Sequence, residues 1–235
     1  MSGWPVARPV LCLVTNRARL AALAGEGRTA AADRLVSQVR EAAEAGIDLV
    51  QVRERDLEAR ELCRLVERCV DAAGGSPTRI LVNDRADVAL AAGAHGVHLR
   101  ADSYEAGRVR AIAPRPFLIG RSVHDGDEAA EMARQGAVDY LVFGTVFATE
   151  SKPDGHAIAG IAGLTAAVKA ALPVPVLAIG GVSVASVSAL REAGAAGLAA
   201  IGLFLPAERG TGPTLIETVH RIRRAFDTPV DLGRD

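Results

Sequence analysis

The chain has 235 residues, a length that suits one large α/β domain with a single hydrophobic core. Apolar residues make up 49% of it and aromatic residues only 3%, so we expect a core of Ala, Val, Leu and Ile and no platform for stacking nucleobases. With 27 basic and 28 acidic residues, the net charge of −1 provides no overall field to attract nucleic acid or an anionic membrane.

The cysteines and the first residues bear on location. Cys12, Cys63 and Cys69 are odd in number and lack the spacing of metal ligands, so we expect reduced packing residues. The opening MSGWPVARP has no apolar segment typical of a signal peptide, and no run is long enough to span a membrane. A cytoplasmic protein without a membrane partner is expected.

Short apolar runs alternate with helical patterns along the whole chain. The predicted strands are residues 10–15, 47–53, 79–83, 95–99, 117–121, 139–143, 174–181 and 195–203. Helical spacing with glycine or proline stops predicts helices at 29–45, 56–73, 86–93, 103–113 and 125–135, one after Gly160, and a last one at 215–226. Residues 16–29 are expected to form a loop or a partial helix.

This alternation predicts a (β/α)₈ TIM barrel with a parallel eight-stranded sheet. We expect one domain over residues 1–235, with the barrel at about 10–205 and a C-terminal helix and tail at 206–235. An open doubly wound sheet is disfavoured, because no Gly-x-Gly-x-x-Gly follows the first strand.

The last two strands each end in glycine, as VPVLAIGG and AAGLAAIGL. Glycine lets the backbone approach an anion closely, and adjacent turns of this kind expose N–H groups. TIM barrels commonly bind phosphate in these two loops. We therefore predict a phosphate site there.

Polar residues follow the other strands, and in a barrel they would share one mouth. They are Gln51, Arg53, Arg55, Asn83, Asp84, Asp102, Ser122, His124, Thr149, Ser151 and Lys152. Converging arginines, a lysine and hydroxyls suit a diphosphate. The alternative for Arg53 and Arg55 is pairing with surface acids.

Two carboxylates and one histidine have alternative interpretations. Asp84 could hold Mg²⁺ with Asp102 as a second oxygen ligand, or each could cap a helix. His124 could transfer a proton to or from a substrate, or be a neutral structural residue. Residues 144–160 are expected to form a lid over a charged ligand, with a plain surface loop as the alternative.

Taken together, these loops resemble the thiamine phosphate synthase and TenI family. The resemblance lies in QVRERD, in ILVNDRADVALAAGAHGVHL, in IGRSVHD, in DYLVFGTVFATESK and in LAIGGV, in order from about residue 10 to 205. It implies an enzyme of thiamine biosynthesis that couples hydroxymethylpyrimidine diphosphate to thiazole phosphate and releases diphosphate.

The resemblance also implies a role for each matching residue. Gln51, Arg53, Asn83 and Lys152 would hold the diphosphate, Asp84 would bind Mg²⁺, Thr149 and Ser151 would contact phosphate, and Gly181 and Gly202 would line the thiazole phosphate site. Phosphorylated small molecules are thus the expected partners, and a homodimer is suggested.

The sequence departs from the family pattern at the second metal acid, which is usually last in a Gly-Gln-Glu-Asp run. Here Ser103 takes that place, Asp102 lies one residue early, and Arg55 replaces a lysine. Two alternatives therefore stay open beside the synthase. One is a TenI-type thiazole tautomerase that uses His124, and the other is a non-catalytic regulatory barrel that binds thiazole phosphate.

Overall fold

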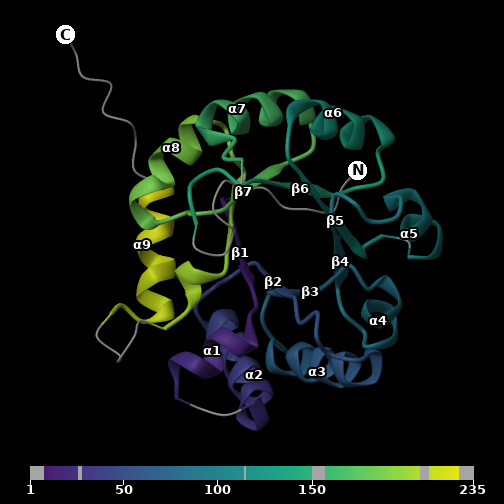
Figure 1. The fold of residues 1–235 in the computed structure, drawn as a ribbon, viewed down its shortest axis with the longest axis vertical. Coiled ribbons are helices and arrows are strands. Elements are labelled where there is room, and N and C mark those ends of the chain that lie inside the picture. Colours follow the sequence, from purple (N-terminus) through teal and green to yellow (C-terminus); the bar gives the residue numbers. More distant parts are fainter. Residues whose placement is uncertain (1–7, 26–27, 114, 150–156, 207–211, 228–235) are drawn as a thin grey trace.

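The computed structural model describes residues 8–25, 28–113, 115–149, 157–206 and 212–227. Eight strands pair in parallel in chain order, and β1 pairs with β8, so the sheet closes into a barrel (Figure 1). The strands are β1 Val10–Val14, β2 Leu49–Val52, β3 Arg79–Asn83, β4 Gly96–Leu99, β5 Leu118–Val123, β6 Tyr140–Phe143, β7 Val176–Ile179 and β8 Gly197–Ala200. The predicted TIM barrel is confirmed.

Helices surround the ring of strands (Figure 1). They are α1 Arg17–Leu23, α2 Arg28–Glu44, α3 Ala59–Ala72, α4 Ala86–Ala91, α5 Ala106–Ile112, α6 Gly126–Gln135, α7 Gly160–Ala171, α8 Val187–Glu192 and α9 Leu215–Asp227. Within the described ranges, none of them has the length and apolar character needed to cross a bilayer.

The hydrophobic core has two layers, as expected for strands with two buried faces. Inside the barrel lie Val10, Cys12, Val14, Leu49, Leu81, Tyr140, Val142, Leu177 and Ala199. A larger layer of mostly aliphatic side chains fills the space between strands and helices. Burial raises the pKa of the Cys12 and Cys69 thiols to about 12, so both are neutral packing groups.

Barrel closure depends on one very close backbone contact. A Cβ atom at Gly197, where φ is +156°, would lie 2.0 Å from the carbonyl oxygen of Val10. Only glycine leaves room for β8 to reach β1 in this register, in which Gly197 pairs with Val10.

The structure changes several local expectations. β7 and β8 end at Ile179 and Ala200, short of the predicted 181 and 203. β5 continues past Arg121 to Val123, because Ser122 and Val123 pair with β6. The first part of the expected lid is packed instead: Thr145 is buried, and the amides of Val146 and Phe147 donate to the carbonyls of Ile179 and Gly180 at 2.9 and 3.0 Å. Residues 150–156 of that loop lie outside the described residues.

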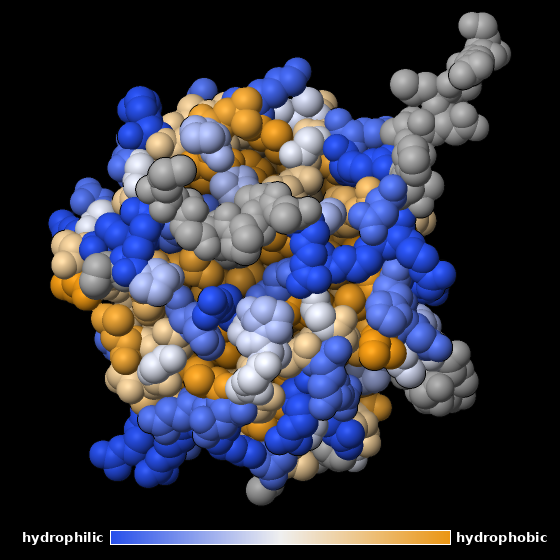
Figure 2. Space-filling model, turned by 180° about the vertical axis from the view of Figure 1, so that it is seen from behind, coloured by the Kyte–Doolittle hydropathy of each residue, from blue (hydrophilic) through white to orange (hydrophobic). Residues whose placement is uncertain are grey.

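A buried ion pair joins α5 to the residue that precedes β6. Asp139 accepts from Arg110 Nη2 at 2.6 Å and from the backbone N–H of Ile119 at 2.8 Å, and its side chain is only 2% exposed. The face opposite to that in Figure 1 carries hydrophilic side chains with apolar ones between them (Figure 2). The buried Asp139 carboxylate itself links α5 to β5 at the start of β6.

We predict that Asp139→Ala lowers the free energy of unfolding by about 3–5 kcal/mol, because it leaves the largely buried Arg110 without its carboxylate. Chemical denaturation of the purified variant measures the loss. The control is Arg68→Ala, which breaks an exposed ion pair with Asp33 and should cost less than about 1 kcal/mol. Equal losses in the two variants would contradict the structural role of Asp139.

Candidate active site

All strands run parallel, so the residues that follow them meet at one end of the barrel, here called the mouth. Most of the predicted site residues follow a strand: Arg53 and Arg55 after β2, Asp84 after β3, Asp102 after β4, His124 after β5, Gly181 after β7 and Gly202 after β8. Three others, Gln51, Asn83 and Ser122, lie near the ends of β2, β3 and β5. Thr149 follows β6, and it is half-buried. Ser151 and Lys152 lie outside the described residues.

Gln51 and Asn83 form a buried pair across β2 and β3. The Gln51 amide donates to Asn83 Oδ1 at 2.9 Å, which fixes the orientation of both side chains. Arg53 follows on the same strand, and its backbone N–H donates to Thr15 Oγ1 at 3.0 Å. Arg53 is half-buried and Arg55 is exposed, and neither guanidinium has an ion-pair partner within the described ranges. Pairing with surface acids therefore does not account for Arg53 among these residues.

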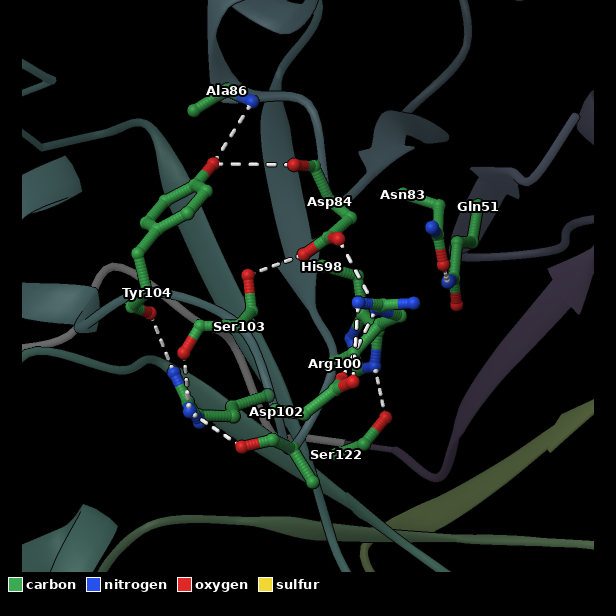
Figure 3. A network of polar contacts seen from close by, with 12 residues as sticks. Gln51, Asn83, Asp84, Ala86, His98, Arg100, Asp102, Ser103, Tyr104 and Ser122 are labelled. Atoms are coloured by element: carbon green, nitrogen blue, oxygen red, sulfur yellow. Dashed lines mark hydrogen bonds and ion pairs between the residues drawn. The ribbon is translucent and has the colours of Figure 1, made fainter. Parts of the chain in front are cut away.

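Asp84 takes a strained backbone conformation, with φ at +60°. Its amide donates to His98 O at 2.9 Å, and the Tyr104 hydroxyl donates to its carbonyl at 3.3 Å. The alternative in which Asp84 caps a helix is wrong, because Arg85 is the N-cap residue of α4. The Asp84 carboxylate instead turns to Ser103 and Arg100 (Figure 3).

Arg100 contacts both carboxylates that the sequence singled out as possible metal ligands. Its Nε lies 3.1 Å from Asp84 Oδ2 and 3.2 Å from Asp102 Oδ1, and its Nη2 donates to Asp102 Oδ2 at 3.2 Å. The Ser103 hydroxyl donates to the other oxygen of Asp84 in a short hydrogen bond. Asp102 caps no helix either, since Glu105 is the N-cap residue of α5.

Sequence reasoning missed Arg100. It also missed Arg121 of β5, which binds the loop that follows β4. The Arg121 guanidinium is buried and donates to the carbonyls of Ala101, Ser103 and Tyr104 at 2.8, 3.1 and 2.8 Å. An arginine inside an apolar strand was the available signal for Arg121, because a buried guanidinium needs several acceptors.

Ser122 is held by a buried polar chain inside the barrel. His98 contacts Ser122 Oγ through Nε2 at 3.0 Å and the Tyr140 hydroxyl through Nδ1 at 3.1 Å. Burial, with a smaller effect of the Arg121 charge, lowers the pKa of His98 to about 3. His98 is therefore neutral and positions the serine.

His124 lies at the surface of the mouth, directly after β5. Its Nδ1 is 2.7 Å from the carbonyl oxygen of Gly144, which can only accept, so Nδ1 carries the proton. In the neutral ring Nε2 then has a free lone pair. This arrangement suits a general base.

The Gly180–Gly181 turn is tight because another loop packs on it. A Cβ atom at Gly181, where φ is +62°, would lie 2.2 Å from the carbonyl oxygen of Ala148. In the described part of the chain, the amides of Gly181 and Val182 donate to no other group. Two adjacent free amides can bind an anion.

A family model for thiamine monophosphate synthase matches residues 20–204. The chain belongs to the thiamine monophosphate synthase family. Among the family's curated proteins, the thiamine-phosphate synthase of Methanoculleus marisnigri is 40% identical over 177 residues, 75% of this chain and 81% of the relative. That of Methanoregula boonei is 40% identical over 190 residues, 81% and 85% of the two chains.

A solved structure of this family is also similar. Thiamine phosphate pyrophosphorylase from Pyrococcus furiosus is 28% identical, with a TM-score of 0.74 over 94% of this chain and 97% of that one. A 3-hexulose-6-phosphate synthase structure, 20% identical with a TM-score of 0.62 over 92% of this chain and 99% of its own, shows the shared fold alone.

We predict that the His98 imidazole stays neutral down to about pH 4.5, well below the ordinary histidine pKa of about 6.5. Its signals in nitrogen-15 NMR should not move between about pH 8 and that value. The unfolded chain takes up this proton first, so the residue's contribution to stability is complete above about pH 6.5 and falls by up to about 1.4 kcal/mol per pH unit towards pH 3. Titration of the His98 ring near pH 6.5 would contradict the buried neutral state.

Proposed function

We propose that the chain is a thiamine-phosphate synthase, which couples hydroxymethylpyrimidine diphosphate to thiazole phosphate and releases diphosphate. Family membership supports the proposal, together with the position of Arg53, Asn83 and the amides of Gly181 and Val182 at one mouth. Within the described residues, these two amides donate to no other group. A cationic side and an amide-lined side match two phosphorylated substrates.

We assign the diphosphate to the side of the mouth formed by β2 and β3. Gln51, Arg53 and Asn83 would hold it, with Arg55 and Ser122 as further contacts, and Thr149, Ser151 and Lys152 would reach it from the loop after β6. The half-buried Arg53 guanidinium, which has no ion-pair partner among the described residues, supports this assignment. A bound arginine fork can offer two parallel donors to phosphate oxygens.

The thiazole phosphate would bind on the opposite side, at Gly181 and Gly202. The Gly181 and Val182 amides offer donors there. Among the described residues, a Cβ atom at Gly202 would meet only Arg19 Nη1, at 3.8 Å, which leaves room for a ligand beside this backbone.

The proposed chemistry needs stabilised charge on a leaving group. As the carbon–oxygen bond to diphosphate breaks, negative charge grows on the diphosphate, and the thiazole nitrogen then attacks the pyrimidine cation. Arg53 and the amide of Asn83, fixed by Gln51, would stabilise that charge without reorganising. No protein nucleophile is required, and water exclusion protects the cation.

The family resemblance implies Mg²⁺, which would neutralise diphosphate charge when bound, and Asp84 is the residue that would hold it. The residues present fit this ion poorly. Both Asp84 oxygens already have partners, Asp102 is paired with Arg100, and Ser103 offers a neutral hydroxyl in place of a carboxylate. The described residues also contain no group of three or more His, Cys, Asp or Glu that could hold a metal.

A thiazole tautomerase is the second candidate function. The specific observation in its favour is His124, whose Nδ1 donates to Gly144 O and leaves Nε2 able to take a proton. The residue is exposed at the mouth, where a substrate could reach it.

We also propose a cytoplasmic location and a homodimer. Three free cysteines, two of them buried, support a reducing compartment. The dimer rests on the family resemblance.

We predict that the purified chain forms thiamine phosphate from the two substrates, and that Arg53→Gln lowers kcat/KM about a hundredfold, the typical effect of losing one charge-stabilising donor. Product formation followed by chromatography measures both. The control is Arg60→Gln, an exposed arginine of α3, which should leave the rate unchanged.

Two outcomes would favour the alternative functions, and a third would contradict the role of Arg53. No thiamine phosphate, with thiazole isomerisation that His124→Ala abolishes, would replace the synthase by the tautomerase. Binding of thiazole phosphate without either reaction would favour the regulatory barrel. An Arg53→Gln rate equal to that of the unchanged chain would contradict the role given to Arg53.

A further inference from the structure

The Arg100 guanidinium lies beside the Asp84 carboxylate, in the place where a bound metal ion would supply positive charge. We infer that Arg100 is a built-in counter-ion for Asp84 that keeps a divalent cation from binding there, so that diphosphate binding does not depend on metal at this position. The choice of diphosphate as ligand rests on the proposed function. The metal exclusion does not.

Each carboxylate oxygen of Asp84 already has a partner inside the protein. One carboxylate oxygen lies 3.1 Å from Arg100 Nε, and the other accepts from the Ser103 hydroxyl. A Mg²⁺ ion needs oxygen ligands at about 2.0–2.1 Å in near-octahedral geometry. A cation that bound Asp84 Oδ2 would meet the guanidinium of Arg100, whose positive charge would repel it.

Asp102 gives little help to such an ion. Its side chain is 75% exposed, and both of its oxygens face Arg100 at 3.2 Å. Ser103 stands where a carboxylate could have completed a pair with Asp84, and a hydroxyl carries no charge to offset the dehydration of Mg²⁺. The Arg100 guanidinium thus forms ion pairs with both carboxylates (Figure 3).

The loop that carries Arg100 is held in place by its neighbours. Arg121 donates to three of its carbonyls, and the Tyr104 hydroxyl bridges the Asp84 carbonyl and the Ala86 amide, each at 3.3 Å. Arg100 Nε itself is buried and makes no aligned hydrogen bond within the described residues, although two carboxylate oxygens lie within 3.2 Å. The contact is therefore mainly electrostatic.

A counter-ion at this position has a clear consequence for anion binding. Asp84 follows Asn83 directly, and Asn83 is held by Gln51 on the proposed diphosphate side of the mouth. An uncompensated carboxylate there would repel a diphosphate, and either a metal ion or an arginine can cancel its charge. In this chain the arginine does so.

The first experiment measures Mn²⁺ binding to the full chain by electron paramagnetic resonance, without substrate. We expect the unchanged protein and Asp84→Asn to bind Mn²⁺ equally, within about twofold. The double variant Arg100→Gln/Ser103→Asp should gain a site at least about tenfold tighter, because it supplies two free carboxylates. Adding Asp84→Asn to the double variant should remove that site.

The second experiment measures inorganic pyrophosphate binding by calorimetry in the presence of EDTA. The unchanged protein should bind it, and Arg100→Gln should bind about tenfold more weakly and recover affinity when Mg²⁺ replaces EDTA. Arg100→Lys should restore part of the affinity in EDTA, because it returns the charge without the fork. The matched control is Arg108→Gln, an exposed arginine near Glu105, which should bind as the unchanged protein does.

Either of two results would overturn the inference. One is a Mn²⁺ site in the unchanged protein that Asp84→Asn removes. The other is pyrophosphate affinity in EDTA that Arg100→Gln leaves unaltered, with circular dichroism showing that the variant is folded. Neither assay uses turnover, so a chain that makes no thiamine phosphate would contradict the proposed function while leaving this inference intact.

Discussion

The close approach of β8 to β1 is the contact on which the rest of the molecule depends. Where a Cβ atom would collide with the Val10 carbonyl, Gly197 lets the eighth strand pair with the first. Closure of a fully parallel sheet brings all carboxyl ends of the strands to one mouth. Residues far apart along the chain, such as Gln51 on β2 and Gly181 after β7, thereby lie at the same end of the barrel.

Polar groups have different roles at the two ends of the barrel. At the amino-terminal end, the buried Asp139–Arg110 pair ties strands together. At the mouth, Arg53 is left without an ion-pair partner among the described residues, while Arg100 forms ion pairs with Asp84 and Asp102. In the inference drawn above, Arg53 remains available to a ligand, and Arg100 neutralises the charge of the two carboxylates.

The sequence was sufficient for the fold and for most strand ends, because buried parallel strands appear as short apolar runs closed by glycine or polar residues. The sequence did not predict the partners of Asp84, because these are set by contacts between residues far apart in the chain. The hydroxyl of Ser103 and the guanidinium of Arg100 reach Asp84 from the next strand, and no local spacing reports that. The strand position of Ser122 likewise depends on pairing with β6, which local propensity does not reveal.

A crystal structure of the chain with thiamine phosphate and inorganic pyrophosphate would test the central claim, that one mouth accepts both phosphate groups. We expect pyrophosphate in contact with Arg53 and Asn83, and the phosphate of thiamine phosphate on the amides of Gly181 and Val182. Either anion bound away from the carboxyl ends of the strands would contradict it.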